Sequence, residues 1–284
     1  MQQAVMQSGL AAAHPKESLI SASLDEGLMA ARSNTQDLVD RISKRLDEVQ
    51  RLRARIHADP MAGQDRRVLR AWQAERMART YADLLQQPRY ESATRFFLDE
   101  VYGANGYPMS DEEVKRILPT MSKLLPEYAL RTVEAAVELD WLSERLDTAL
   151  AQALREAQDD PDDPLEISAA AYVRAYRATG EPDERERQFV LLCKIGHELD
   201  RLASKPLIGT TLHLMRGPAA LTGLQRLQAF LEHGFRAFQK MEGADEFLDV
   251  IAHRERLISE QIYAGRGRPF HIAESRLMPE SARA

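Results

Sequence analysis

Hydrophobic residues recur every three or four positions along most of the chain, which is the spacing of one face of an α-helix. The clearest pattern begins after Asn34, a residue type that often caps a helix N-terminus. Its apolar seam consists of Leu38, Ile42, Leu46, Val49, Leu52 and Ile56. Pro60 and Gly63 then predict a turn, and a second pattern from about 65 to 86 predicts a returning helix. Residues 34–86 are therefore expected to form a helical hairpin.

Residues 89–157 are expected to form central helices, the longest of which runs from about 127 to 157. Further helices are predicted near 165–179, 183–203, 206–216, 218–241 and 244–263. No segment alternates between apolar and polar residues with the period of two that indicates a strand. The sequence thus predicts an all-α multi-helix bundle of about nine or ten helices. Residues 34–264 are expected to form its single domain, with 165–264 as the C-terminal helices.

The two ends of the chain lack a sustained helical pattern. Residues 1–33 are rich in alanine, serine and glutamine, and they are expected to be a flexible segment. The tail from 265 to 284 begins with Gly-Arg-Gly-Arg-Pro and is expected to be disordered.

The amino-acid composition argues against several classes of protein. The net charge of −6 gives no general reason to expect binding to nucleic acid. The single cysteine, Cys193, cannot form an intramolecular disulfide, and its neighbours are apolar. No stretch of 18 uncharged apolar residues is present that could span a membrane. We therefore expect a cytoplasmic protein.

The chain carries none of the common metal or cofactor signatures. His197 and Glu198 are followed by Leu and Asp, and the second histidine of a zinc-binding helix motif is missing. Asp159, Asp160 and Asp163 have the spacing of a magnesium-binding motif, but the neighbouring prolines favour an exposed turn. No phosphate-binding loop or dinucleotide fingerprint is present. We expect no cofactor and no resident metal.

Aromatic, apolar and charged residues occur closest together in one stretch of nine residues, Arg95-Phe96-Phe97-Leu98-Asp99-Glu100-Val101-Tyr102-Gly103. On a helix, Glu91, Arg95 and Asp99 form a column of alternating charge, and Arg95 and Asp99 are expected to form a buried pair. Tyr102 is expected to donate its hydroxyl to Asp99. The two phenylalanines widen the apolar face, so this helix is expected to lie between others. The candidate structural or binding residues are Arg95, Phe96, Phe97, Asp99, Glu100 and Tyr102.

The segment FFLDEVYG resembles the signature of bacterial proteins named for an FFLEELY motif. The positions that agree with that name are Phe96, Phe97, Leu98, Glu100 and Tyr102. Asp99 stands in place of glutamate and Val101 in place of leucine, and both changes keep the charge or the apolar character. The family is uncharacterised, so the resemblance implies no catalytic residue.

A second candidate site lies in residues 207–219, which combine two glycines and two threonines with His213 and Arg216. Downstream, Gly234 falls within an apolar seam. A small residue at such a position permits close helix contact or leaves a pocket, and both outcomes fit the sequence.

The predicted hairpin is basic. Between Asp40 and Arg79 there are 11 Lys and Arg residues against 6 Asp and Glu. Few aromatic side chains are present there for stacking on nucleic-acid bases, so a solvated helix face is the simpler interpretation. The narrow seam of the first helix also suits pairing with a second chain, which makes residues 34–86 a candidate for homo-oligomerisation.

Two functions fit these patterns. The first, which the patterns favour over the second, is a non-enzymatic interaction or adaptor protein with an unidentified protein partner. The second is a small-molecule or lipid-binding protein, or an enzyme, with a pocket near the FFLDEVYG helix and residues 210–216. A deep pocket with converging polar groups favours the second function, and a flat apolar patch favours the first.

Overall fold

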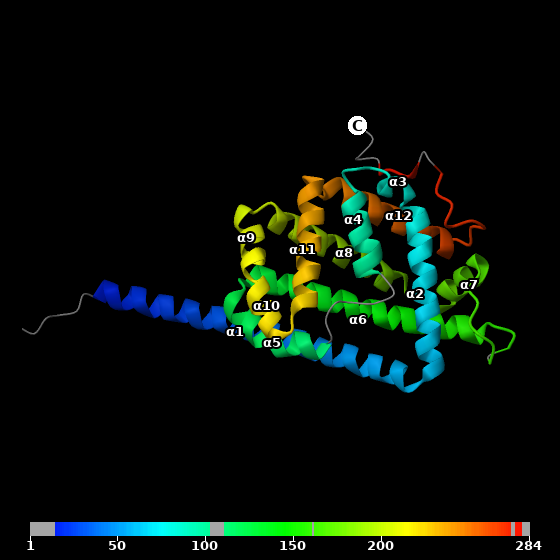
Figure 1. Ribbon diagram of the computed structural model, residues 1–284. Coiled ribbons are helices and arrows are strands. Elements are labelled where there is room, and N and C mark those ends of the chain that lie inside the picture. The colour runs from blue at the N-terminus through cyan, green and yellow to red at the C-terminus, as the bar shows by residue number, and fades with distance from the viewer. Residues whose placement is uncertain (1–14, 103–110, 161, 274–275, 280–284) are drawn as a thin grey trace, which may run out of the picture.

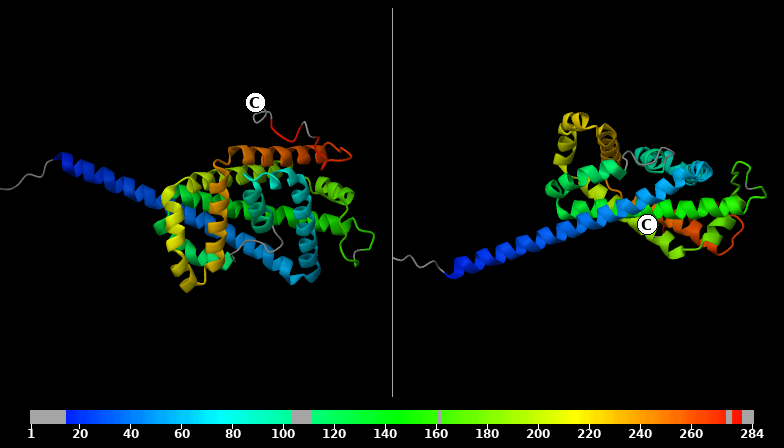
Figure 2. Two further views of the ribbon diagram at one scale, coloured as in Figure 1. Left: turned by 45° about the horizontal axis from the view of Figure 1, so that its top comes forward. Right: turned by 90° about the horizontal axis from the view of Figure 1, so that it is seen from below.

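Figure 1 shows the chain as a computed structural model, which describes residues 15–102, 111–160, 162–273 and 276–279. These residues form ten α-helices of seven residues or more and no strand, which confirms the all-α prediction. The helices pack into one body around α6 (Glu127–Glu156), and a long part of α1 (Pro15–Ala58) projects from that body (Figures 1 and 2). The predicted flexible segment before residue 15 lies outside the described residues.

Helix α6 is the axis of the domain. It begins after Pro126, whose extended backbone starts the helix cleanly, and twelve of its thirty residues are buried. Helix α1 packs along one side of α6 and α8 (Pro182–Ala203) along another. Two further helices, α2 (Pro60–Thr80) and α7 (Ala169–Thr179), also contact it. A helix with neighbours on several sides needs many buried positions, which explains its length and apolar character.

The chain turns from α1 to α2 at Pro60. Asp59 caps α2, because its side chain accepts hydrogen bonds from the backbone N–H groups of Met61 and Ala62 at 2.9 and 3.2 Å. Pro60 stands in the first turn, where the N–H group that it lacks would have no helical partner.

Helix α1 begins at Pro15, whereas the sequence predicted a flexible segment up to residue 33 and a helix start after Asn34. No glycine or proline lies between residues 28 and 34, so nothing interrupts the helix there. The seam residues Leu38, Ile42 and Val49 are fully buried. They lie where α1 packs against α6 and α5 (Asp111–Leu124) of the same chain. This packing occupies the seam that was a candidate for pairing with a second chain.

The C-terminal helices pack over α8. Helix α12 (Asp245–Tyr263) lies against α8, and α11 (Gln225–Met241) lies against α8 and α4 (Glu91–Phe96). A short helix, α3 (Ala82–Leu85), connects α2 to α4. This arrangement brings α4 and α11, which are distant in the sequence, side by side (Figure 1).

The helix boundary before α11 lies at a different residue from the predicted one. Helix α9 (Pro206–Leu214) is followed by α10 (Arg216–Thr222), which runs through Gly217 and Pro218, the residues that were expected to separate two helices. Proline is accepted in the first turn of a helix because the N–H group that it lacks has no partner there. The chain breaks instead at Gly223, whose positive φ of 76° ends α10 in the left-handed conformation.

The FFLDEVYG motif does not continue as a regular α-helix. Helix α4 ends at Phe96, and the next residues form a π-helical turn, η1 (Phe97–Val101). In this turn the Tyr102 N–H donates to the Phe97 carbonyl at 2.9 Å, five residues back. Phe96 and Phe97 are both buried, and the Phe97 ring centre lies 5.7 Å from that of Phe247. Both phenylalanines therefore belong to the core.

Gly234 of α11 allows the motif to approach closely. A Cβ atom at this position would lie 2.9 Å from Cζ of Phe96, closer than such atoms pack. The missing side chain thus seats Phe96 against α11, where its ring centre also lies 5.1 Å from that of Phe230. Of the two outcomes that the sequence allowed for this glycine, the structure shows close helix contact.

The expected buried pair of Arg95 and Asp99 is wrong. Both residues are exposed, and Arg95 forms a surface ion pair with Glu91 at 3.1 Å. The π-helical turn rotates the residues that follow it relative to a regular α-helix. Tyr102 therefore lines the interior while Asp99 lies at the surface, and the expected hydrogen bond between them does not form.

The sequence predicted disorder from residue 265, but the described residues of that tail, 265–273 and 276–279, contact the domain. Arg254 of α12 is completely buried and donates a hydrogen bond to the Leu277 carbonyl at 2.9 Å. The Phe270 ring lies edge-on to Trp72 of α2, with ring centres 5.6 Å apart. These contacts hold this part of the tail against α2 and α12.

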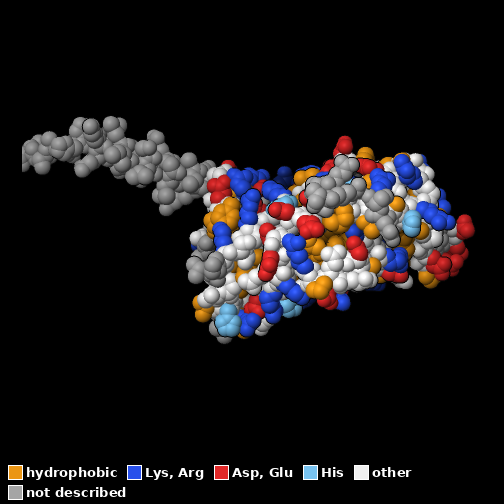
Figure 3. All heavy atoms as spheres, turned by 90° about the horizontal axis from the view of Figure 1, so that it is seen from above, with side chains coloured by type: hydrophobic (Ala, Val, Ile, Leu, Met, Phe, Trp, Pro, Cys, Tyr) orange, Lys and Arg blue, Asp and Glu red, His pale blue; other side chains and the backbone are white. Residues whose placement is uncertain are grey.

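Buried ion pairs fasten the basic hairpin to α6. Asp140, Glu144 and Asp147 lie on one side of α6 and are at most 9% exposed. Arg53 of α1 contacts Asp140 at 2.7 Å and Glu144 at 3.1 Å, and Arg66 of α2 also pairs with Glu144. The hairpin face that was expected to be solvated is thus partly buried. On the face of the domain that Figure 3 shows from above, basic and acidic side chains are interspersed.

Truncation of Phe97 to alanine should lower the free energy of unfolding by about 3–5 kcal/mol, because it removes a buried ring from the core. Asp99→Asn, on the same turn, should change it by less than about 0.5 kcal/mol, because Asp99 is exposed. Chemical denaturation followed by circular dichroism measures both values. Equal effects of the two substitutions would contradict the packing described for η1.

A further prediction concerns the pH dependence of stability. Burial raises the pKa of Asp140 to about 6, although the nearby Arg53 opposes the rise. Between about pH 4 and pH 6 the folded carboxyl group therefore holds a proton that the unfolded one has lost. The stability linked to this group is fully present below about pH 4 and is lost as the pH rises through about 6.

Asp140→Asn should remove this loss of stability at higher pH, because asparagine does not ionise. The unfolding free energy of the variant relative to that of the wild type should therefore rise by up to about 3 kcal/mol as the pH increases from about 4 to about 7. Denaturant titrations of both proteins across this pH range measure the difference. A difference that stays constant with pH would show that Asp140 does not titrate as described.

Candidate functional site

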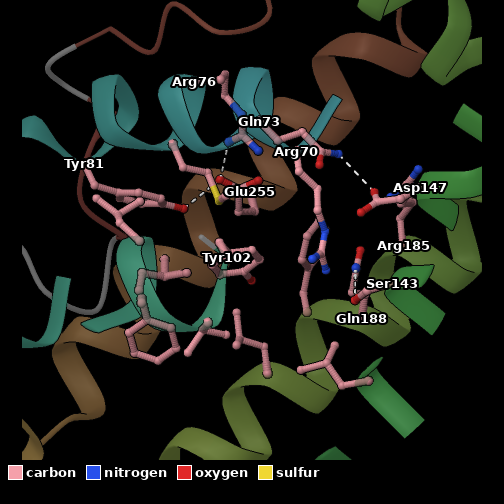
Figure 4. A pocket seen from close by; sticks show the side chains of 18 of the residues that line it. Arg70, Gln73, Arg76, Tyr81, Tyr102, Ser143, Asp147, Arg185, Gln188 and Glu255 are labelled. Carbon is pink, nitrogen blue, oxygen red and sulfur yellow. Dashed lines mark hydrogen bonds and ion pairs between the residues drawn. The ribbon is translucent and has the colours of Figure 1, made fainter. Parts of the chain in front are cut away.

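A cavity of about 110 Å³ lies inside the domain, between α2, η1, α6, α8 and α12 (Figure 4). Part of its wall is apolar and includes Phe97, Leu98 and Val101 of η1. The rest is polar and contains three arginines, two glutamines, four tyrosines and three carboxylates. A cavity with an apolar surface and a few converging polar groups is typical of a small-molecule site.

Helix α2 directs Arg70, Gln73 and Arg76 at the cavity, because residues three positions apart share a helix face. Arg76 forms an ion pair with Glu255 of α12 at 2.5 Å, and the Tyr81 hydroxyl donates to the same carboxylate at 2.7 Å. Burial raises the pKa of Tyr81, and the negative charge of Glu255 raises it further. The phenol therefore stays protonated and acts as a hydrogen-bond donor.

Helices α6 and α8 build the other side of the cavity. Gln73 donates from α2 to Asp147 at 3.1 Å, and Gln188 donates to the hydroxyl oxygen of Ser143 at 2.8 Å. Burial raises the pKa of Asp147, against the opposing effect of Arg185. The carboxyl group of Asp147 therefore keeps its proton to a higher pH than an exposed aspartate does.

Arg185 of α8 is only 4% exposed, yet its guanidinium forms no hydrogen bond or ion pair with the residues that the structure describes. Its Cζ atom lies 4.6 Å from the centre of the Tyr176 ring. The ring covers one face of the guanidinium, while the N–H groups lie in the plane of the guanidinium and point away from its edges. Arg185 is among the residues that line the cavity, so its unpaired guanidinium borders that space.

The candidate residues of the motif lie on two sides of η1. Phe97 and Tyr102 line the cavity, where burial raises the pKa of the Tyr102 phenol. The outer side forms a separate shallow groove against α11, lined in part by Arg95, Phe96, Asp99 and Glu100. In this groove Glu100 contacts Nδ1 of His233 at 2.7 Å.

His213 and Arg216 lie on α9 and α10 and are both exposed. Arg216 pairs with Glu232 of α11 at 2.6 Å, and this hydrogen bond lowers the pKa of Glu232 to about 2. Neither residue lines the cavity. Of the two segments expected to border a pocket, only the motif does so in the part of the chain that the structure describes.

The sequence analysis missed most of the polar residues of the cavity, although a signal for Arg185 was present. Arg185 precedes Leu192 by seven residues and Gly196 by eleven, so all three lie on the buried side of α8. A charged residue on the apolar side of an amphipathic helix is either paired in the core or part of a site. The same reasoning applies to Asp147, which lies on the buried side of α6.

Within the described ranges, no three His, Cys, Asp or Glu side chains are grouped closely enough to hold a metal ion. None of the helices described is both long and apolar enough to cross a membrane. Burial raises the pKa of the half-buried Cys193, which favours the thiol over the nucleophilic thiolate.

No curated protein and no solved structure matches the chain. A family model described as a domain of unknown function, DUF8198, matches residues 51–269, which is more than half of the chain. The matched range includes α2, η1, α6, α8 and α12, so all of the elements that line the cavity lie within it. The chain therefore belongs to the DUF8198 family of domains of unknown function.

Proposed function

We propose that the protein binds a small molecule in the cavity between α2, η1, α6, α8 and α12. One observation carries this proposal: polar side chains of α2, α6, α7, α8 and α12 converge on one interior space. Imperfect packing can leave an apolar void, but polar groups cost stability when they are buried without partners. Most of the polar groups here pair with one another, and a bound molecule would supply a partner for Arg185, which has none among the described residues.

The size of the cavity limits the ligand. Its volume of about 110 Å³ is somewhat smaller than the ~150 Å³ of an engineered apolar cavity that holds benzene. A ligand of roughly six non-hydrogen atoms is therefore the expected size. Leu98, Val101 and Leu192 offer it an apolar surface, and the arginines and amides offer hydrogen bonds.

The motif contributes the wall of this site. A π-helical turn admits one residue more than an α-helical turn, and such turns are frequent at functional sites. In η1 the wider turn places Leu98, Val101 and Tyr102 on the cavity. The proposal thus gives the π-helical shape of η1 a role that packing alone does not require.

Val101→Trp should fill the cavity and abolish binding, since the indole takes up the space of the ligand. The wild-type protein should carry a small molecule that native mass spectrometry detects. At about one hundred times its dissociation constant, that molecule should raise the melting temperature by roughly 5 to 10 °C. Val101→Trp should lose both the bound mass and this shift.

Val190→Trp is the matched control, because Val190 is 50% exposed on α8 and does not line the cavity. This variant should keep the bound molecule and its thermal shift. Wild-type protein that carries no small molecule, and that no compound of suitable size stabilises, would refute the proposed function.

We place this function in the cytoplasm. The one cysteine of the chain is free, and a free thiol suits a reducing compartment. Its half-buried position in α8 also protects it from oxidation.

A second candidate function, interaction with other protein chains, is favoured by the shape of α1. The N-terminal part of this helix extends beyond the domain (Figure 2). Isolated helices are marginal in water, so a projecting helix gains stability from a partner. Leu214 and Met215, 70% and 47% exposed at the junction of α9 and α10, offer further apolar surface to an adaptor's partner.

Deletion of residues 1–33 should leave the domain folded, because the variant keeps the buried seam residues Leu38, Ile42, Leu46 and Val49. The deletion should reduce self-association, because it removes the projecting part of α1. Light scattering coupled to size-exclusion chromatography measures the mass of both proteins, and circular dichroism monitors their folding. A full-length protein that is monomeric at high concentration would exclude self-association through α1.

A further inference from the structure

Arg185 is set apart from the other buried arginines of the domain. Arg53, Arg66 and Arg76 each contact at least one carboxylate. Arg254 is held by Asp83 through two hydrogen bonds of 2.7 Å. The guanidinium of Arg185 has no comparable partner among the described residues, and its Nε and Nη2 atoms are buried without a hydrogen bond.

This arrangement is unfavourable for Arg185. A buried charge without a hydrogen-bond partner destabilises a fold, and contact with the Tyr176 ring compensates only in part. Asp147 is the carboxylate that acts on Arg185 electrostatically, but it lies beyond ion-pair distance and accepts its hydrogen bond from Gln73. The geometry thus leaves the guanidinium of Arg185, which borders the cavity, without a carboxylate of its own among the described residues.

We infer that the ligand of the cavity is a compact carboxylate, held by the guanidinium of Arg185 with its apolar body against η1. This inference rests on the proposed function and adds the chemical class of the ligand. A guanidinium and a carboxylate are both planar and can form two parallel hydrogen bonds. Ser143 accepts a hydrogen bond from Gln188 and so retains a hydroxyl proton for donation to the same anion.

The charge of the cavity favours a monoanion. Arg76 is paired with Glu255, and Arg70 lies 3.7 Å from Glu144, so Arg185 is the arginine of the cavity wall that lacks a carboxylate partner. One guanidinium without a carboxylate partner can pair with one carboxylate, whereas phosphate brings a larger charge into the same buried space. The apolar side of the cavity, formed by Leu98, Val101 and Leu192, suits a short hydrocarbon body.

Calorimetric titration of the full-length wild-type protein tests the ligand class directly. The probes are butanoate, its neutral isostere butanamide, and inorganic phosphate, the first two having equal size. Butanoate should bind at least about tenfold more tightly than butanamide, because the amide forms no charge-assisted pair with Arg185. Phosphate should bind more weakly than butanoate.

Equal affinity for butanamide would overturn the inference while leaving the proposed function intact, and so would tighter binding of phosphate. Failure of all three probes would also overturn it. The proposed function would then still be judged by the mass of the molecule that co-purifies with the wild-type protein. A neutral co-purified molecule would support that function and exclude a carboxylate ligand.

Arg185→Met should weaken butanoate binding by roughly ten- to a hundredfold. The ligand-free variant should melt no lower than the wild type, because methionine replaces a buried charge that lacks a partner. Arg187→Met is the control, since Arg187 lies two residues away on α8 and forms an exposed ion pair with Glu138. A large loss of stability in ligand-free Arg185→Met, with butanoate binding retained, would assign Arg185 a structural role and overturn the inference.

Discussion

The structure depends on the burial of three carboxylates, Asp140, Glu144 and Asp147, along one side of α6. A carboxylate that loses its water needs a cation or several hydrogen-bond donors beside it. Arg53 and Arg66 bring cations to Glu144 from α1 and α2. The apolar seam of α1 decides which side of that helix faces α6, and these ion pairs decide how far along α6 the hairpin sits.

In this network of buried charges, Asp140 has an arginine partner and Asp147 has none among the residues that the structure describes. Asp140 has Arg53 as an ion-pair partner, whereas Asp147 is held by the neutral amide of Gln73. Arg185, which could have neutralised Asp147, remains at a distance from it and stacks on Tyr176. The cavity borders this incomplete end of the network, so its polar character follows from the way in which the helices are held together.

The π-helical turn connects this interior site to the packing of the C-terminal helices. Phe96 lies against Gly234 of α11, and Phe97, the next residue, packs toward Phe247 of α12 and the cavity. The same turn therefore contributes to the stability of the core and to the wall of the site. This double role offers a physical reason for two adjacent phenylalanines in the stretch that resembles an FFLEELY motif, and the DUF8198 match includes it.

The sequence by itself determined the fold class and much of the apolar core. The period of three to four residues reflects the local geometry of a helix, and the seam at Leu38, Ile42 and Val49 is buried as such a seam should be. The same local rules misplaced the start of α1 and the break at Gly223, because capping and breaking residues act only where the backbone leaves the helix.

The tertiary structure decided which charged residues are buried and which of them have partners. Arg53 meets Asp140 across 87 positions of the chain, and Arg76 meets Glu255 across 179. A pattern of polar and apolar residues cannot show such partners, because the free energy of a buried charge depends on the groups that the fold places beside it. In the sequence, Arg185 cannot be told apart from the arginines of the hairpin. Only the packing of α6 and α8 shows that Arg185 is unpaired among the described residues and that an arginine such as Arg66 is paired.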